Sequence, residues 1–308
     1  MNGLISVVVP VYNEEGNVVE LAGRIHTVLK NLKKKYEIIF VDDASRDNTS
    51  GVLESVKGIT ILRHRKNSGQ TAALRNGFEY AKGDIIITMD GDLQDDPSEI
   101  PRFLEKLNEG WDVVCGWRKK RRDVLWKHIV SRIANKTRKF LLGDKIHDSG
   151  CTFRVQRAEA VKNLDLYGEM HRFLPALMRM QGFRVTEIKV AHHERKWGRT
   201  KYGMNKVLKG FLDVLSVWFW KQYASKPNHL FGGVGLVSAG LGFLLGVLLF
   251  VLRAFYDYRL STSSLPLLAI FLVVFGWQFI ITGILSDISI RSYRKLVKEK
   301  NIALVKKT

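Results

Sequence analysis

The chain has 308 residues, of which 46% are hydrophobic, and it carries a formal net charge of +19 at pH 7. This length holds one large domain or two ordinary ones. The positive charge favours anionic partners: nucleic acid, acidic lipid headgroups or phosphorylated substrates. The two cysteines, Cys115 and Cys151, fit no metal-ligand spacing or disulfide framework. This excludes a disulfide-stapled secreted domain and favours a reducing, cytoplasmic setting.

Short β-branched runs alternate with helical patterns through the first half of the chain. The first apolar run is too short for the core of a signal peptide, so it is interpreted as a buried strand. The alternation predicts βαβ units and a mainly parallel sheet, which is the Rossmann-like α/β class. The predicted strands are Ile5–Val9, Glu37–Val41, Thr60–Leu62, Asp84–Thr88 and Asp112–Cys115.

Two helices in this region have clear signals of their own. Apolar residues recur at helical spacing over Val18–Leu32. A later helix is predicted to have Asp96 as its N-cap, Pro97 as its first residue and Glu99 as the capping-box partner. Gly110 is expected to close its far end.

Polar clusters follow three of the predicted strands. They are Tyr12-Asn13-Glu14, Asp42-Asp43 and the run Asp90–Gln94. In open α/β sheets, ligands bind beyond the carboxyl ends of the strands. The three clusters therefore predict a binding site at one edge of the sheet.

The acidic run after the fourth strand predicts a metal site. Asp90 and Asp92 stand two residues apart, beside the amide oxygen of Gln94. Such oxygens suit a hard cation, and Mg²⁺ or Mn²⁺ completes its shell with diphosphate and water. A lone D-x-D arises often by chance, but its place between a strand and a capped helix makes this one more specific. A plain acidic turn before a helix accounts for Asp96 and Glu99 and leaves the first two aspartates unexplained.

Two basic stretches carry interleaved apolar and aromatic residues. They run from about 118 to 142 and from 207 to 223. This composition is typical of helices that lie in the headgroup region of a membrane, and amphipathic packing on a protein core is the alternative. For the second stretch the interfacial interpretation is favoured, because a long apolar run follows it directly.

Two apolar runs near the C-terminus predict a transmembrane hairpin. Leu230–Leu252 and Leu265–Ser286 contain no charged residue and are each long enough, at roughly 33 Å, to cross the hydrocarbon core. Lysine and arginine concentrate outside the pair, which by the positive-inside rule places both termini in the cytoplasm. The expected organisation is a cytoplasmic catalytic domain over 1–205, an interfacial helix and linker over 206–228, the hairpin over 229–290 and a basic tail over 291–308.

Seven short segments together resemble a known family. They are Val8–Glu14, Val41–Thr49, Asn67–Gln70, Met89–Pro97, Ser149–Arg154, His171–Pro175 and Arg199–Gly203. In order and spacing the chain is similar to the family-2 glycosyltransferases of the nucleotide-diphospho-sugar transferase (GT-A) fold. It most resembles the group that makes polyprenyl-phosphate sugars, which includes dolichol-phosphate mannose synthase. The resemblance covers nearly all of the soluble part and the two-span tail.

The resemblance implies a set of site residues. The nucleotide-sugar pocket would comprise Pro10, Tyr12, Glu14, Asp42, Asp43, Gln70 and Asp90, with Asp42 accepting hydrogen bonds from the base. The metal ligands would be Asp90, Asp92 and Gln94. The catalytic candidates are Asp92, Arg118, Arg132 and Asp148. The acceptor-phosphate candidates are Arg118, Arg132, Arg199 and Lys201.

The resemblance also implies the reaction: inverting, metal-dependent transfer of a sugar from a UDP- or GDP-sugar to undecaprenyl or dolichyl phosphate at the cytoplasmic membrane. A phosphate monoester, with a second pKa of about 6, is already largely dianionic at pH 7. It therefore needs little help from a general base. Asp148 is kept as a candidate for one of two roles, a base or a group that orients the acceptor. Members of the group form tetramers, so a homotetramer is one expectation that the resemblance implies.

Two alternatives differ from this interpretation. A processive polysaccharide synthase shares the donor fold but usually carries Q-x-x-R-W and more membrane spans, and Arg195-Lys196-Trp197 lacks the glutamine and the order. A basic membrane-tethered binding protein would suit the charge. The chain has no recognised nucleic-acid motif, however, and the acidic strand ends would repel a polyanion.

Overall fold

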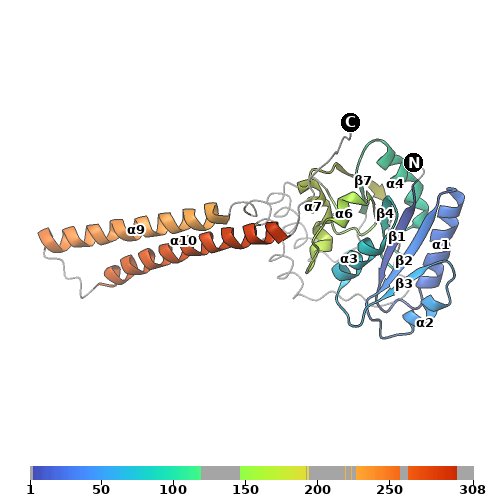
Figure 1. Ribbon diagram of the computed structural model, residues 1–308, viewed down its shortest axis with the longest axis horizontal. Coiled ribbons are helices and arrows are strands. Elements are labelled where there is room, and N and C mark those ends of the chain that lie inside the picture. The colour runs from blue at the N-terminus through green and yellow to red at the C-terminus, as the bar shows by residue number, and fades with distance from the viewer. Residues whose placement is uncertain are drawn as a thin grey trace. The chain divides into compact units, whose positions relative to one another are not determined.

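The computed structural model describes residues 3–118, 146–191, 193, 219, 223, 227–256 and 263–296, and the side chains of the last helix as far as residue 289. The chain divides into two compact units, Met1–Val217 and Trp218–Thr308. Each unit is described by itself (Figure 1).

The first unit is built on a seven-stranded sheet with strand order β3-β2-β1-β4-β6-β5-β7. The strands are β1 Ile5–Val11, β2 Tyr36–Asp42, β3 Thr60–Arg63, β4 Ile85–Thr88, β5 Val113–Arg118, β6 Arg154–Arg157 and β7 Val185–Val190. Strands β1 to β4 pair in parallel, as do β5 and β7, while β6 runs antiparallel to both of its neighbours. The predicted mainly parallel α/β sheet is confirmed, and all five predicted strands form.

The helices of this unit follow the order expected for βαβ units. They are α1 Val18–Asn31, α2 Thr49–Glu54, α3 Gln70–Tyr80, η1 Pro97–Glu99, α4 Ile100–Asn108, α6 Glu159–Lys162, η2 Met170–Phe173 and α7 Leu174–Met180. Asp96 caps η1 by accepting a hydrogen bond from the Ser98 N–H at 2.9 Å. The predicted reciprocal half of the capping box is wrong, because the Glu99 carboxylate pairs with Arg102 instead.

Helices cover both faces of the central strands, as the uniform burial of β1 requires. Side chains alternate along a strand, so Val7 and Val9 join Phe40 and α1 in the main core while Val8 points to the opposite face. There α3 packs closely, since a Cβ added to Gly77 would lie 2.3 Å from the Val8 Cγ1 atom. Figure 1 shows α1 and α3 on opposite sides of these strands. Each buried valine or phenylalanine contributes about 1.5–3 kcal/mol.

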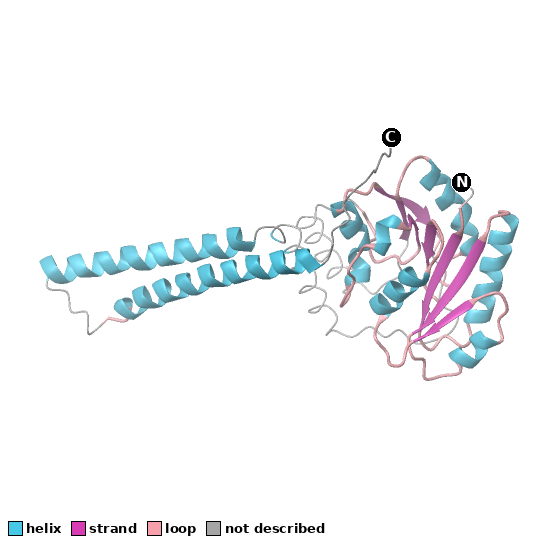
Figure 2. Cartoon of the chain, in the orientation of Figure 1, coloured by secondary structure: helices cyan, strands magenta, loops and turns pink. Residues whose placement is uncertain are grey.

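The second unit consists of two long helices, α9 (Pro227–Tyr256) and α10 (Leu265–Leu296), which lie side by side (Figure 2). Small residues allow the close approach. A Cβ on Gly235 would lie 2.6 Å from the Gly276 carbonyl oxygen. The Ser238 hydroxyl donates across the pair to the Leu272 carbonyl at 2.9 Å, which satisfies it without water.

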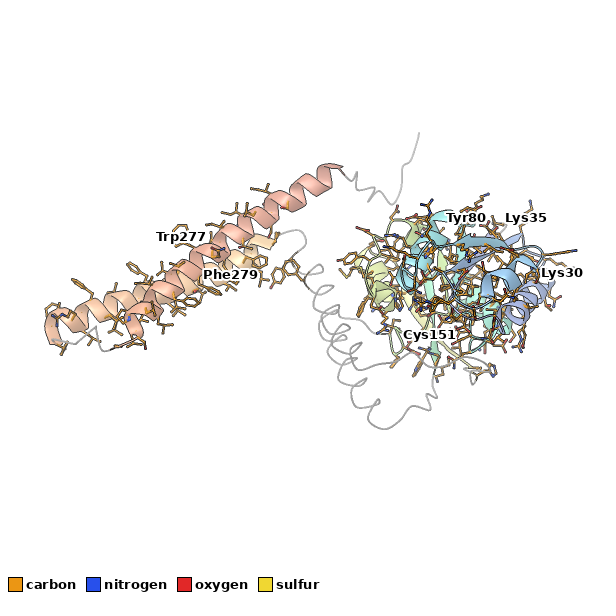
Figure 3. The ribbon with its side chains drawn as sticks, turned by 90° about the horizontal axis from the view of Figure 1, so that it is seen from below. Lys30, Lys35, Tyr80, Cys151, Trp277 and Phe279 are labelled. Atoms are coloured by element: carbon orange, nitrogen blue, oxygen red, sulfur yellow. The ribbon has the colours of Figure 1, made fainter. Side chains whose placement is uncertain are left out.

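Both helices are apolar on their outer faces as well as where they meet. Only 22% of the most apolar stretch of α9 and 17% of that of α10 are buried within the structure. The side chain of Trp277 projects outward, as Figure 3 shows, and Phe250 is 72% exposed. The core helix of a water-soluble protein would be mostly buried, so the long apolar helices fit a lipid environment. The two predicted apolar runs are thus confirmed as helices long enough to cross a membrane.

Candidate active site

The carboxyl ends of β1, β2 and β4 meet at one edge of the sheet, because the three strands are parallel neighbours. The loop that follows each of these three strands contains a non-glycine residue in the left-handed region: Asn13 at φ 56°, Ala44 at φ 57° and Leu93 at φ 62°. Such a backbone costs of order 1 kcal/mol or more per residue and persists only where surrounding contacts hold it. The three predicted polar clusters therefore lie at the same edge, in tightly specified loops.

The first two loops are tied to each other. The Asn13 N–H donates to the Ser45 hydroxyl at 2.9 Å, and the Glu14 N–H donates to the Thr49 hydroxyl at 2.8 Å. The Glu14 carboxylate accepts a hydrogen bond from the side-chain amide of Asn17. These bonds hold Tyr12 and Glu14 half-buried beside the end of β2. Of the predicted pocket residues in this strand and loop, Pro10 is buried within β1 itself.

Asp42 is the last residue of β2 and is fully buried. Its Oδ1 atom accepts hydrogen bonds from the backbone N–H and the hydroxyl of Ser45, at 2.9 and 2.6 Å. Its Oδ2 atom has no hydrogen-bond partner among the described residues, and the nearest cation is the Arg63 Nε at 3.9 Å. A buried carboxylate oxygen without a donor is costly, so this atom is available to a ligand N–H.

Asp43 has a different environment, although it is the next residue. Its Oδ1 atom accepts from the His64 Nδ1 and the Ser68 N–H, and its Oδ2 atom accepts from the Gly69 N–H, all within 2.8 Å. The loop over 64–69 is therefore anchored to the end of β2. Gly69 has φ +88°, which favours glycine, and it leads directly into Gln70 at the start of α3.

The acidic loop after β4 concentrates negative charge. Asp92 and Asp95 are buried and Asp90 is half-buried. Burial, followed by the charge of Asp92, raises the pKa of Asp90 to about 6. Burial and the charge of Asp90 raise the pKa of Asp95 to about 7. The charge of Arg118 acts to lower both pKa values. Both stay raised, because burial and the neighbouring carboxylates outweigh it.

Side chains from other elements orient this loop. The Gln70 amide donates to the Asp90 Oδ1 at 2.8 Å and reaches the Thr152 hydroxyl at 3.5 Å. The Asp92 Oδ1 accepts from the Gln94 N–H at 3.2 Å. The Gln94 side-chain amide donates to the His193 carbonyl, also at 3.2 Å. Its nitrogen is thereby fixed to the protein, which leaves its oxygen as the atom for a metal.

The oxygens of Asp90, Asp92 and Gln94 fit a divalent cation that would take only some of its ligands from the protein. Among the described residues, no three His, Cys, Asp or Glu side chains are grouped closely enough to hold an ion unaided. The Asp90 and Asp92 carboxylates repel each other, since the charge of Asp92 contributes to the raised pKa of Asp90. A hard cation would relieve that repulsion, and Mg²⁺ or Mn²⁺ commonly keeps most of its shell for phosphate oxygens and water.

Arg118 and Asp148 form a half-buried ion pair at the end of β5. The Arg118 Nε donates to the Asp148 Oδ2 at 2.7 Å, and a terminal nitrogen donates to the other oxygen at 3.1 Å. Burial alone would lower the pKa of Arg118, but the hydrogen bond to Asp148 keeps that pKa above its ordinary value. Arg118 thus remains charged beside the acidic loop. Asp148 holds it in place with both oxygens, so its geometry suits orientation better than proton abstraction.

Several residues at this edge were not predicted. Arg154 is 1% exposed, and its guanidinium donates to the carbonyls of His171 and Ser149. Its Nε atom has no hydrogen-bond partner, and no carboxylate in the described part of the chain lies within ion-pair distance. Its charge lowers the pKa of Asp90. Arg154 and Thr152 do belong to one of the family segments, which was the available signal. Arg132, Arg199 and Lys201 lie outside the described residues.

The motifs and the fold define a class of protein that comparison with known proteins confirms. The family model described as Glycosyl transferase family 2 matches residues 6–165 of this chain. The chain belongs to this family and is a glycosyltransferase. The solved glucosyl-3-phosphoglycerate synthase of Mycobacterium tuberculosis, in complex with Mn²⁺ and UDP-glucose, has the same fold at a TM-score of 0.54 and 19% identity, over 71% of this chain and 79% of that one.

This chain has higher sequence identity to two other relatives than to that solved structure. A dodecaprenyl-phosphate galacturonate synthase of Rhizobium johnstonii is 36% identical over 94% of this chain and 88% of the relative. An undecaprenyl-phosphate 4-deoxy-4-formamido-L-arabinose transferase of Proteus mirabilis is also 36% identical, over 94% and 89%. These matches confirm the expected resemblance to the polyprenyl-phosphate group, and they extend through the two-helix tail.

Proposed function

We propose that the protein transfers a sugar from a nucleotide-diphosphate sugar to a polyprenyl phosphate, which yields the polyprenyl-phosphate sugar and a nucleoside diphosphate. The observation that carries the proposal is the meeting of two unlike groups at one sheet edge. The buried Asp42 Oδ2, which accepts no hydrogen bond from the described residues, suits the N–H of a base, and the Asp90–Asp92 pair suits a cation on a diphosphate. The names of the two relatives support the acceptor class.

The donor would lie across the ends of β1, β2 and β4. Pro10, Tyr12 and Glu14 would border the nucleoside, with Asp42 reading the base. Asp43 would act through the loop that it anchors, by setting the position of Gln70 against Asp90. A loop fixed in advance loses less entropy when the donor binds.

Asp90, Asp92 and the Gln94 oxygen would hold Mg²⁺ or Mn²⁺. When bound, the cation supplies charge neutralisation for the departing diphosphate. The presence of Mn²⁺ with UDP-glucose in a protein of the same fold supports a divalent ion. Arg118 lies beside the same carboxylates and stays charged, so it would stabilise negative charge as the bond to the leaving group breaks.

The acceptor phosphate needs orientation more than activation. Its oxygen is already anionic at pH 7, so direct in-line attack on the anomeric carbon would invert configuration without a dedicated base. Asp148 would keep Arg118 oriented for this step. Arg132, Arg199 and Lys201 remain the proposed acceptor-side cations.

The membrane arrangement is part of the proposal. The helices α9 and α10 would form a transmembrane hairpin, and the basic flanks would keep residues 1–205 and the 291–308 tail in the cytoplasm. This arrangement would put the donor site in the compartment of nucleotide sugars. The amphipathic linker over 206–228 would lie at the bilayer surface.

A nucleotide-sugar panel tests the proposal. The detergent-solubilised full chain is incubated with undecaprenyl phosphate and single UDP- or GDP-sugars, with Mn²⁺, with Mg²⁺ or with a chelator. At least one sugar should appear in the lipid fraction with a divalent ion and not with the chelator. Asp92→Asn serves as the inactive control. If no nucleotide sugar binds or reacts under any of these conditions, the proposal is wrong.

A further inference from the structure

A basic hollow on the first unit adjoins the Asp42 end of the candidate active site, since Arg63, which lines it, has its Nε atom 3.9 Å from the Asp42 Oδ2 atom. It has a volume of about 350 Å³, which is room for roughly ten water molecules. Its lining residues are Arg63, His64, Arg65, Lys66, Ser68, Ala72, Arg75 and Asn76. One wall is the end of β3 with the segment that follows it, and the other is α3. None of the residues predicted for the active site lines it.

The charge of this hollow is one-sided. Four of the eight lining residues are permanent cations, and none is a carboxylate. Within the described part of the chain, neither Arg65, Lys66 nor Arg75 forms an ion pair, although Arg75 donates to the Leu166 carbonyl at 3.4 Å. Cations gathered in one concavity repel each other, and an anion placed among them turns that repulsion into attraction.

His64 and Asn76, two of the other lining residues, are held in place by hydrogen bonds. His64 is 10% exposed at its side chain and lies between the Asp43 Oδ1, at 2.8 Å, and the Asn76 side-chain nitrogen, at 2.9 Å. The first contact ties the β3 segment to the end of β2, and the second joins it to α3. The floor is therefore a built structure, whereas a solvated row of surface cations has no such support.

We propose that this hollow binds a phosphate-bearing anion at a second site, which adjoins the donor site but is lined by none of the residues predicted to hold the donor or the acceptor. Guanidinium groups on two walls match the several oxygens of a phosphate, which they bind through paired hydrogen bonds. The phosphate can belong to a lipid headgroup or to a free phosphate compound. The chemistry of the site is the same for both.

The site is joined to the donor loop by covalent and hydrogen-bonded contacts. His64 lines the hollow and donates to Asp43, and the same carboxylate accepts from Ser68 and Gly69 just before Gln70. An anion that draws the two walls together would reduce the motion of this loop. Slower hydrogen exchange at the Ser68 and Gly69 amides is the expected signature.

Two matched double variants test the site. Arg65→Gln with Lys66→Gln removes two exposed cations from the hollow, and Lys30→Gln with Lys35→Gln removes two exposed cations elsewhere on the unit, where Figure 3 shows them at its periphery. Both variants change the net charge equally. The removed side chains are exposed and form no ion pair among the described residues, so both variants should fold.

The first arm uses inorganic phosphate and the full chain in a neutral detergent, at constant ionic strength and with a chelator present. Calorimetric titration should give a saturable site whose affinity falls at least tenfold in Arg65→Gln/Lys66→Gln and stays within twofold in the lysine control. Arg75→Gln should weaken the same site from its other wall. This result identifies a free phosphate as sufficient.

The second arm compares nanodiscs of phosphatidylcholine with and without phosphatidylglycerol. Exchange at the 68–69 amides should slow with the anionic lipid in the wild type and the lysine control, and not in Arg65→Gln/Lys66→Gln. A response only in this arm identifies a lipid headgroup. If the two double variants behave alike in both arms, the site does not exist. Neither arm needs transferase activity, so failure here is distinct from failure of the proposed reaction.

Discussion

Asp95→Asn should remove part of the pH dependence of stability in the metal-free protein. Asp95 is 2% exposed, and burial with the charge of Asp90 raises its pKa from 3.8 to about 7. Because the folded pKa is above the unfolded one, the folded state retains the proton longer. Stability from this group is therefore present at acid pH and is lost as the pH rises toward 7.

The two pKa values set the size of the effect. One pKa unit corresponds to about 1.4 kcal/mol, so the full penalty approaches about 4 kcal/mol, and about 2.5 kcal/mol of it develops between roughly pH 5 and pH 8. For a unit of this size that corresponds to a shift of about 5–10 °C in the melting temperature. Asparagine has no proton to lose at this position, so the variant lacks this part of the dependence.

The assay is thermal unfolding of the wild type and of Asp95→Asn, in detergent with a chelator, across this pH range. The wild type should lose melting temperature relative to the variant as the pH rises, and Mn²⁺ at the highest pH should restore the wild type more than the variant. Parallel pH curves for the two proteins would refute the charge-cluster reasoning. Ser98→Ala, in the neighbouring turn, controls for local loosening of the loop.

Three further substitutions test individual roles. Asp92→Asn should reduce transfer below detection without changing the melting temperature at acid pH, and full turnover would remove Asp92 from the metal site. Asp42→Asn should weaken nucleotide binding about 10- to 100-fold, since it replaces an acceptor by a donor at a cost of about 1.5–3 kcal/mol. Unchanged binding by calorimetry would show that the Oδ2 atom does not read the base. Asp148→Asn should lower kcat while keeping the pH profile, because Arg118 loses one charged contact of about 1.5–3 kcal/mol; loss of an acidic-limb pKa would instead make Asp148 a general base.

Much of the fold could be predicted because its signals are local. The apolar strand Ile5–Val11 and the periodic helix Val18–Asn31 depend on neighbours within a few residues. Strand β6 was not predicted, because Arg154–Arg157 is short and its ends are cationic. Its burial becomes intelligible only with β4 and β5 paired on either side.

The location of the site could be predicted from the sequence, whereas few of its internal contacts could. That Asp42 and Asp43 end a strand follows from the pattern of the chain. That one carries a free oxygen and the other anchors a loop depends on Ser45 and on residues twenty or more positions away. The Arg118–Asp148 pair joins residues 30 positions apart. Such pairings arise only when the sheet brings separate loops together.

The reversed direction of β6 also determines at which edge of the sheet the connection between β5 and β6 begins and ends. Strand β5 leaves the sheet at the edge that carries the acidic loop, and the chain returns to that edge at Ile146 before β6 starts at Arg154. Arg118 and Ile146, the described residues on either side of the 119–145 segment, thus lie at one rim of the sheet. A change in the length of the connection between them would leave the pairing of β5 with β6 and of β6 with β4 intact.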